Sequence, residues 1–303
     1  MKKGKWIIVS IITTLLIHSV PETVCAFAGE TKAMVRPAAA LPTASGAQTA
    51  QNERAVIDYS NISDGYVMAN YTAAAGGKLK AQVTGPGGTY TYNLSPGTWA
   101  TFPLSEGSGS YKVTIYENVA DNKYATVLSC SFQAALGSEL APFLRPNQYV
   151  DYGGAVSTLA KAAELAGSAE STIGKVEKVY DFVVGNLTYD TNKAANVKSG
   201  YLPVLDSVLS SGKGICFDYA ALMAGMLRSQ GIACKLVVGY AGTAYHAWIS
   251  VWTEEEGWID GIIYFDGKEW HRMDPTFASA NGSSESIMDY IGNGSNYSKK
   301  YQY

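Results

Sequence analysis

Cysteine and histidine are scarce in this sequence of 303 residues, which has four cysteines and three histidines. No cysteines form a C-x-x-C pair, so the closely spaced ligands typical of structural zinc sites are missing. The sequence has no G-x-S-x-G, G-x-x-x-x-G-K-[ST] or G-x-G-x-x-G motif, so serine hydrolases, P-loop NTPases and dinucleotide-binding enzymes have no support. A D-x-[DN]-x-[DN]-G calcium loop is absent as well. We therefore expect neither a metal nor a cofactor.

An excess of positive charge is also missing. The chain has 23 basic and 26 acidic side chains, and its first 28 residues hold three of the lysines and one glutamate. The remaining residues thus carry 20 basic against 25 acidic side chains, a net charge of about −5. Nucleic-acid-binding proteins need a basic surface for the phosphate backbone, so nucleic acid is not an expected partner.

Residues 1–28 have the pattern of a secretory signal peptide. They begin with three lysines, continue with an apolar run over 6–17 and end in Ala-Phe-Ala. This run is shorter than the roughly 20 apolar residues that a membrane span needs, so we expect cleavage before Gly29 rather than an uncleaved anchor. Cys25 raises the alternative of a lipid anchor, but the preceding Glu-Thr-Val lacks the apolar pattern expected there. The predicted location is extracellular, with cell-wall association as an option and no membrane span after cleavage.

An odd number of cysteines follows this segment, namely Cys130, Cys216 and Cys234. Three cysteines cannot form a closed set of disulfides, so at least one thiol is free. Cys130 and Cys234 each lie in a run of alternating polarity, which predicts buried strand cysteines. The remaining thiol, Cys216, is the one that calls for a functional explanation.

Changes in composition and in hydrophobic periodicity divide the rest of the chain into four units. Residues 29–52 are rich in Ala, Thr and Pro without a period, which predicts a flexible linker. Short runs of period two, separated by glycine pairs, predict a small all-β sandwich of immunoglobulin-like type over 53–136. Its tyrosines could stack on sugar rings or serve the strands alone. A connector over 137–152 leads to the C-terminal domain, 153–303.

This last domain is predicted to be α+β, with helices first and an antiparallel sheet second. Apolar residues recur there at helical spacing, and the sequence then changes to alternating runs joined by short turns. The tail over 293–301 either adds a last strand or stays loose. Predicted helices cover 155–166, 170–186 and 216–230, a loop covers 187–203, and predicted strands cover 234–241, 245–253, 259–265 and 269–274.

Cys216, His246 and Asp274 have the order and setting of a nucleophile, a base and an orienting carboxylate. Cys216 follows a glycine-rich turn at the start of a predicted helix, where the helix dipole favours a thiolate. His246 and Asp274 lie on predicted strands, while His271 is an odd number of residues from Asp274 and should face the other way. A histidine that only fills the core, and a zinc site built from Cys216, Cys234, His246 and Asp274, are the alternatives.

The motifs around these residues resemble the transglutaminase-like superfamily of papain-type thiol enzymes. They are Gly-Ile-Cys-Phe-Asp-Tyr-Ala at 214–220, His-Ala-Trp at 246–248 and Asp-Pro-Thr at 274–276. The resemblance covers roughly 150–280 and implies a papain/transglutaminase-like fold with a Cys216, His246 and Asp274 triad. It also suggests that Tyr189 helps the backbone N–H of Cys216 to hold the oxyanion.

A secreted thiol enzyme acting on amide bonds of protein or cell-envelope peptides is therefore the predicted function. The thioester at Cys216 would be resolved by water, as in a cysteine protease or amidase, or by an amine, as in a protein-glutamine acyltransferase. The triad does not choose between them. The alternative is a catalytically inactive domain that serves as a cell-surface binding or scaffold module.

Overall fold

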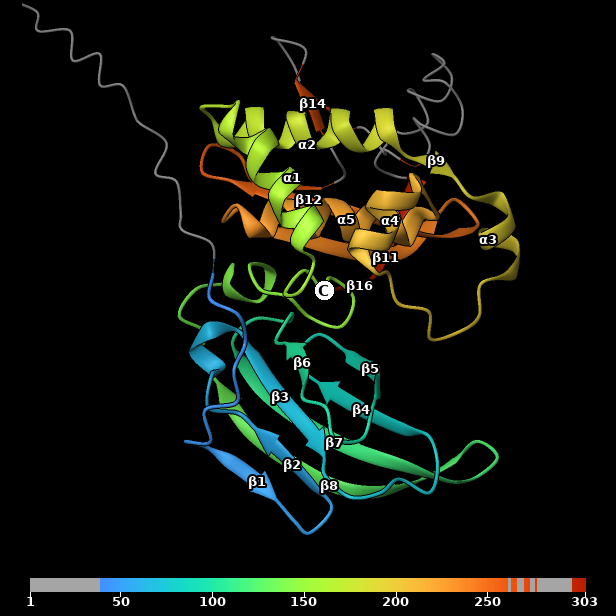
Figure 1. The fold of residues 1–303 in the computed structure, drawn as a ribbon. Coiled ribbons are helices and arrows are strands. Elements are labelled where there is room, and N and C mark those ends of the chain that lie inside the picture. The colour runs from blue at the N-terminus through green and yellow to red at the C-terminus, as the bar shows by residue number, and fades with distance from the viewer. Residues whose placement is uncertain (1–38, 261–262, 266–269, 273–275, 277–295) are drawn as a thin grey trace, which may run out of the picture. The chain divides into compact units, whose positions relative to one another are not determined.

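The computed structural model describes residues 39–260, 263–265, 270–272, 276 and 296–303 (Figure 1). The predicted signal peptide, residues 1–28, lies outside the described residues. Asp274 also lies outside them. Among the residues that the structure describes, no helix combines the length and the apolar character needed to cross a membrane.

The N-terminal half of the described chain is made of strands (Figure 1). They form two four-stranded antiparallel sheets, ordered β1-β2-β3-β6 and β5-β4-β7-β8. Side chains alternate between buried and exposed along β4 and β5, and apolar residues of both sheets share one buried cluster. The strands are β1 Thr49–Gln51, β2 Ala55–Asp58, β3 Tyr66–Tyr71, β4 Leu79–Thr84, β5 Thr89–Leu94, β6 Ala100–Pro103, β7 Gly109–Ala120 and β8 Lys123–Ala134, with short 3-10 helices at Ile62–Asp64 and Ala141–Phe143.

Residues 39–52 differ from the flexible linker predicted for 29–52. Strand β1 pairs with β2, and the backbone N–H of Gly46 donates to the Asp58 carboxylate at 2.7 Å. The carbonyl of Thr43 accepts from the Asn61 side chain at 2.8 Å. Composition suggested a tether, but these hydrogen bonds attach the segment to the first sheet. The boundaries of the other units, and the immunoglobulin-like type of the sheets, stay predictions.

Helices precede the second group of strands, which confirms the predicted α+β class. The first two begin and end within about two residues of the predicted 155–166 and 170–186, and the Ser171 hydroxyl caps the second by accepting from the Gly174 N–H at 3.0 Å. The segment predicted as a loop over 187–203 contains a short strand and a helix. The elements are α1 Val156–Gly167, α2 Thr172–Asn186, β9 Thr188–Tyr189, α3 Thr191–Asn196, α4 Leu205–Ser211, β10 Lys213–Gly214 and α5 Cys216–Ser229.

The last of these helices, α5, is the centre of the C-terminal half. Every residue from Asp218 to Arg228 is buried. Helices α1, α2 and α4 pack against α5, and so do strands β11 Cys234–Ala241 and β12 Ala244–Thr253 (Figure 1). Because α5 is enclosed by these elements, its first residue is held at a fixed position relative to the sheet.

The sheet beside α5 has the order β13-β12-β11-β16 and is antiparallel. The sequence predicted one strand over 259–265, but the structure has β13 Gly257–Asp260 and β14 Ile263–Phe265 there, and β14 pairs separately with β15 Trp270–Arg272. The tail left open by the sequence forms a strand, β16 Tyr297–Gln302, which pairs with β11. The fourth position of the sheet is thus filled from the far end of the sequence.

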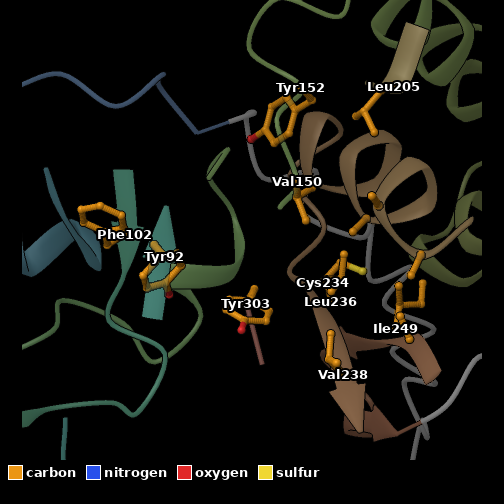
Figure 2. Packing of buried hydrophobic residues seen from close by; sticks show 14 of the residues in the cluster. Tyr92, Phe102, Val150, Tyr152, Leu205, Cys234, Leu236, Val238, Ile249 and Tyr303 are labelled. Atoms are coloured by element: carbon orange, nitrogen blue, oxygen red, sulfur yellow. The ribbon is translucent and has the colours of Figure 1, made fainter. Parts of the chain in front are cut away.

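Tyr303 links this sheet to the all-β region. Its backbone N–H and carbonyl exchange hydrogen bonds with Leu236 at 2.8 and 2.9 Å. Its ring meets the ring of Tyr92 edge-on, with centroids 6.0 Å apart. Figure 2 shows Tyr303 between Tyr92 and Phe102 on one side and the strand of Leu236 and Val238 on the other. One apolar cluster therefore runs through both halves of the described chain.

The end of α5 is fixed by the fully buried guanidinium of Arg228. It donates to the backbone carbonyls of Cys234 at 2.8 Å, Arg145 at 2.8 Å and Tyr303 at 2.5 Å. Burial lowers the pKa of Arg228 from its ordinary value. These hydrogen bonds satisfy the buried cation and tie the helix to β11, to the connector and to the end of β16.

Lys235 on β11 is a half-buried cation held against aromatic rings. Its ammonium lies 3.8 Å from the ring centroid of Trp258 and 5.0 Å from that of Phe143. Burial, with a smaller contribution from the Lys299 charge, lowers the pKa of Lys235 to about 8. The loss of hydration thus outweighs the attraction of the rings.

Lys235→Met is expected to stabilise the protein by about 1 kcal/mol at pH 7, after allowance for solvent screening of a side chain that is not fully buried. Below pH 8 the lysine is charged in both states and the burial cost is fully present. As pH rises from 8 toward 10.5, the unfolded state binds more protons than the folded state, so the cost fades. Urea unfolding at pH 7 and 10 measures the difference in the free energy of unfolding between Lys235→Met and the wild type, with exposed Lys178→Met as the control. An equal gain at both pH values would contradict it.

Candidate functional site

Cys216 is the first residue of α5 and is half-buried. The chain reaches it through β10 and an extended Ile215, whose φ and ψ are −97° and 174°. The Asp218 carboxylate accepts the N–H of Ile215 at 2.8 Å, which is the acidic half of a capping box. Gly214 has no room for a side chain, because an added Cβ would lie 2.6 Å from the Cβ of Asp218. This turn places the thiol where the unpaired N–H groups of a helix start gather.

Two further side chains hold the Asp218 carboxylate, which is fully buried. The Lys193 ammonium binds it at 2.7 Å and also donates to the Tyr201 hydroxyl at 2.5 Å, while that hydroxyl donates to Asp218. Burial, followed by the hydrogen bond to Asp218, raises the pKa of Tyr201 to about 12. Burial alone would lower the pKa of Lys193, but its hydrogen bonds to Asp218 and Tyr201 raise it. Lys193 therefore keeps its charge and Tyr201 its proton at neutral pH.

Asp218 lies within the Gly-Ile-Cys-Phe-Asp-Tyr-Ala motif, but the motif predicts no role for it, and no sequence pattern points to Lys193 or Tyr201. An acidic residue three positions after a helix cap is a known N-terminal signal, so Asp218 could have been found. Lys193 lies on α3, in the segment predicted as a loop, and Tyr201 follows in the same segment. Their convergence on Asp218 is a tertiary contact that no local pattern indicates.

His246 lies near the start of β12 and is buried. Its ring stacks on that of Trp248 at 6.2 Å between centroids and lies 6.4 Å from the ring of Tyr297 on β16. Gly239 pairs with His246 on the neighbouring strand, and a Cβ there would lie 2.0 Å from the Ser298 carbonyl oxygen. The small residue therefore allows β16 to approach the strand beside His246.

Cys216, His246 and Tyr189 line one cavity of about 530 Å³. The structure therefore brings three of the four predicted site residues together. Asp274 lies outside the described residues, so the third member of the triad stays a prediction. The complete lining is Thr91, Tyr149, Tyr189, Ala194, Val197, Lys198, Gly200, Tyr201, Ile215, Cys216, Phe217, Val238, Tyr245, His246, Ala247, Tyr301 and Tyr303.

Tyr189, the predicted oxyanion residue, is held next to the cysteine turn. It belongs to β9, and its partner in the parallel pair with β10 is Gly214. Burial, followed by the electrostatic effects of Cys216 and Tyr219, raises the pKa of Tyr189 above its ordinary value. The phenol therefore keeps its proton at neutral pH and can donate a hydrogen bond beside Cys216. Its role in holding an oxyanion stays a prediction.

The other two described cysteines have a different environment. Cys234 is fully buried on β11, as predicted, and burial raises its pKa to about 12. Cys130 is half-buried on β8, and burial raises its pKa as well. Since the thiolate is the nucleophile, both are poor ones at neutral pH. In the described ranges, no three His, Cys, Asp or Glu side chains form a possible metal site.

Residues 159–261 match the sequence model of the transglutaminase-like superfamily. The match confirms the resemblance predicted from the cysteine and histidine motifs. It includes Cys216 and His246 and ends before Asp274. Family members of this kind are thiol-dependent acyltransferases and proteases that act on protein substrates.

Individual relatives match over short stretches. A protein-glutamine gamma-glutamyltransferase of Pseudomonas aeruginosa is 32% identical over 68 residues, which are 18% of this chain and 10% of that protein. An uncharacterised Bacillus subtilis protein, YebA, is 26% identical over 117 residues, 32% of this chain and 16% of that protein. The periplasmic domain of TgpA from Pseudomonas aeruginosa superposes with a TM-score of 0.36 at 14% identity, covering 80% of this chain and 99% of that domain. The chain thus spans at most about a sixth of these two sequence relatives.

Proposed function

From the transglutaminase-like region at residues 159–261, we propose that this chain is a thiol enzyme that cleaves amide bonds of protein or peptide substrates through a thioester at Cys216. One observation carries the proposal, which is that Cys216 at the start of α5 lines the same cavity as His246. A helix start favours the thiolate, and a histidine in the same cavity can accept and return a proton.

The proposed reaction has two halves. The Cys216 sulfur attacks the carbonyl carbon of the amide while His246 holds the thiol proton, and the carbonyl oxygen becomes an oxyanion. The backbone N–H of Cys216 and the phenol of Tyr189 stabilise this oxyanion. The C–N bond then breaks, the leaving nitrogen takes the proton from His246, and a thioester remains on Cys216. Asp274 orients the imidazole through its other ring nitrogen.

The second half releases the acyl group. Water or a primary amine attacks the thioester carbon, His246 takes the incoming proton, and the C–S bond breaks to return the Cys216 thiolate. Water gives a carboxylic acid, as in a cysteine protease or amidase, and an amine gives a new amide, as in an acyltransferase. The Pseudomonas relative that is named a gamma-glutamyltransferase supports testing transfer first. We also propose secretion and action on extracellular or cell-envelope protein, from the signal-like pattern of residues 1–28.

Alkylation of each cysteine by iodoacetamide, followed by mass spectrometry from pH 4 to 9, tests the nucleophile. Cys216 is expected to react at least about 10² times faster than Cys234 at pH 7, because burial raises the pKa of Cys234 to about 12. His246→Ala is expected to lower the alkylation rate of Cys216 below pH 7, since no histidine is then present to hold the thiol proton. Cys130 provides an internal comparison.

Labelling of Cys216 that is as slow as that of Cys130, and that ignores His246, would contradict the proposal. It would leave the alternative of an inactive binding or scaffold module. If iodoacetamide labels Cys216 rapidly, a fluorescent primary amine supplied with glutamine-containing protein separates the two outcomes of the thioester. Incorporation of the amine identifies transfer, and release of acid or ammonia without incorporation identifies hydrolysis.

A further inference from the structure

The cavity at Cys216 has an aromatic lining with one lysine. Six of its lining residues are tyrosines, and Lys198 is its only lysine or arginine, in the part of the chain that the structure describes. No aspartate or glutamate belongs to the described lining. Such a surface favours apolar or aromatic groups and attracts negative charge.

Part of this lining comes from outside the transglutaminase-like region. Tyr149 belongs to the connector, Tyr301 and Tyr303 to the C-terminal segment, and Thr91 to β5 of the all-β region. The Tyr149 and Tyr303 rings lie 4.2 Å apart between centroids, and Tyr149 lies 5.7 Å from Phe217, the residue after the nucleophile. The three tyrosines, Tyr149, Tyr301 and Tyr303, form one wall of the cavity. This wall is anchored, because Tyr303 is hydrogen-bonded through its backbone to Leu236.

Two of the wall's phenols, those of Tyr149 and Tyr303, are also uncharged. Burial, against a smaller opposing effect of a hydrogen bond with Tyr303, raises the pKa of Tyr149. Burial, followed by the electrostatic effect of neighbouring Tyr149, raises the pKa of Tyr303 far above its ordinary value. Both phenols therefore stay neutral in any physiological solution, and they present ring faces and edges to a bound group.

Two side chains of the cavity lining are exposed to solvent. Tyr245 is 61% exposed, precedes His246 and packs edge-on against Tyr240 with centroids 5.5 Å apart. Lys198 is exposed on the segment after α3. A large aromatic ring that is exposed beside a nucleophile is available to a substrate rather than used by the core. A substrate bound in this cavity can therefore contact an exposed aromatic ring and an exposed lysine.

We propose that this cavity is a substrate subsite that selects a peptide with an aromatic side chain next to the reacting amide and an acidic residue near Lys198. The proposal rests on the proposed function, since it names the peptide that Cys216 attacks. The aromatic side chain packs on the ring of Tyr245 and on the wall of Tyr149, Tyr301 and Tyr303. The acidic residue pairs with Lys198. Selection thus comes both from Lys198 and Tyr245, which the family match includes, and from the three wall tyrosines, which it does not.

Peptides that carry a chloroacetamide in the place of the reacting amide test the proposal without knowledge of the natural substrate. The Cys216 sulfur forms a bond to the methylene carbon and chloride leaves, so mass spectrometry gives a rate for each peptide. Four short peptides combine Phe or Gly beside the chloroacetamide with Glu or Lys at the next position. Each rate is divided by the iodoacetamide rate of the same protein, which removes differences in thiol reactivity and leaves recognition alone.

The Phe and Glu peptide is expected to react at least about tenfold faster than the Gly and Lys peptide. Tyr245→Ala should remove about fivefold of the Phe preference, and Lys198→Gln about twofold to threefold of the Glu preference. Both side chains are exposed, so the variants should fold normally. Trp99→Ala and Lys178→Gln are matched controls, because both residues are exposed and neither lines the cavity, and both should keep the wild-type preferences.

Equal normalised rates for the four peptides, with rapid iodoacetamide labelling of Cys216, would overturn the subsite and leave the proposed function standing. A preference that survives both Tyr245→Ala and Lys198→Gln would also overturn it, because the selection would then lie elsewhere. Slow labelling of Cys216 by iodoacetamide and by every peptide would remove the proposed function, and the subsite with it.

Discussion

Replacing Cys216 with alanine is expected to lower the turnover of an amide substrate by at least about 10³-fold, to the background of the assay. The expected loss is this large because the sulfur forms the covalent intermediate, and no other described cysteine lines the cavity. The fold should survive, since Cys216 is half-buried at a helix start and alanine is a good helix former. Release of product from a fluorescent peptide amide, at matched protein concentration, measures the effect.

Cys130→Ala is the matched control for this substitution. Cys130 is half-buried as well, but it lies on β8 of the all-β region and does not line the cavity. It should keep wild-type turnover. Thermal unfolding of both variants shows whether any loss comes from the fold. Cys216→Ala that keeps more than about a tenth of the wild-type turnover, in a folded protein, would contradict a thioester at this residue.

Replacing Lys193 with methionine is expected to destabilise the protein by about 2 kcal/mol. The carboxylate of Asp218 is fully buried, and the substitution removes the only cation that is paired with it in the described part of the chain. An unpaired buried charge costs several kcal/mol, and the remaining hydrogen bonds from Ile215 and Tyr201 reduce this cost. For a protein of 303 residues, the midpoint of thermal unfolding should fall by about 3 °C.

The same substitution should slow the labelling of Cys216, because Asp218 holds the turn in which the nucleophile lies. Lys193→Met combined with Asp218→Asn is the informative partner variant. Asparagine keeps an acceptor for the Ile215 N–H but carries no charge, so the double variant should be more stable than Lys193→Met alone. Exposed Lys178→Met is the control for loss of a lysine. If Lys193→Met unfolds at the wild-type temperature, the ion pair does not contribute to stability.

Local pattern was sufficient for the elements that carry the predicted nucleophile and base. A glycine-rich turn followed by apolar residues at helical spacing predicted a helix from Cys216, and α5 begins at that residue. Alternating runs predicted β11 and β12, and the structure has both within a residue of the predicted bounds. These signals are local, because the period of a helix or strand is set by its own backbone geometry.

Other features depended on contacts between distant residues. Residues 39–52 resembled a tether by composition, but pairing with β2 makes part of that segment a strand. The tail could not be assigned from its residues, because β16 gains its hydrogen bonds from β11, about 60 positions earlier. The predicted loop after α2 contains α3, which carries Lys193 to the Asp218 carboxylate.

The sequence by itself determined the reactive residue types, their order and the α+β class, since these follow from side-chain chemistry and from periods of two and 3.6 residues. Only the tertiary structure decided that Cys216, His246 and Tyr189 share one cavity, and that Tyr149, Tyr301 and Tyr303 form its wall. Residues far apart in the chain meet because burial of apolar surface brings their elements together. That driving force has no direction, so the spacing of residues along the chain does not reveal which partners it selects.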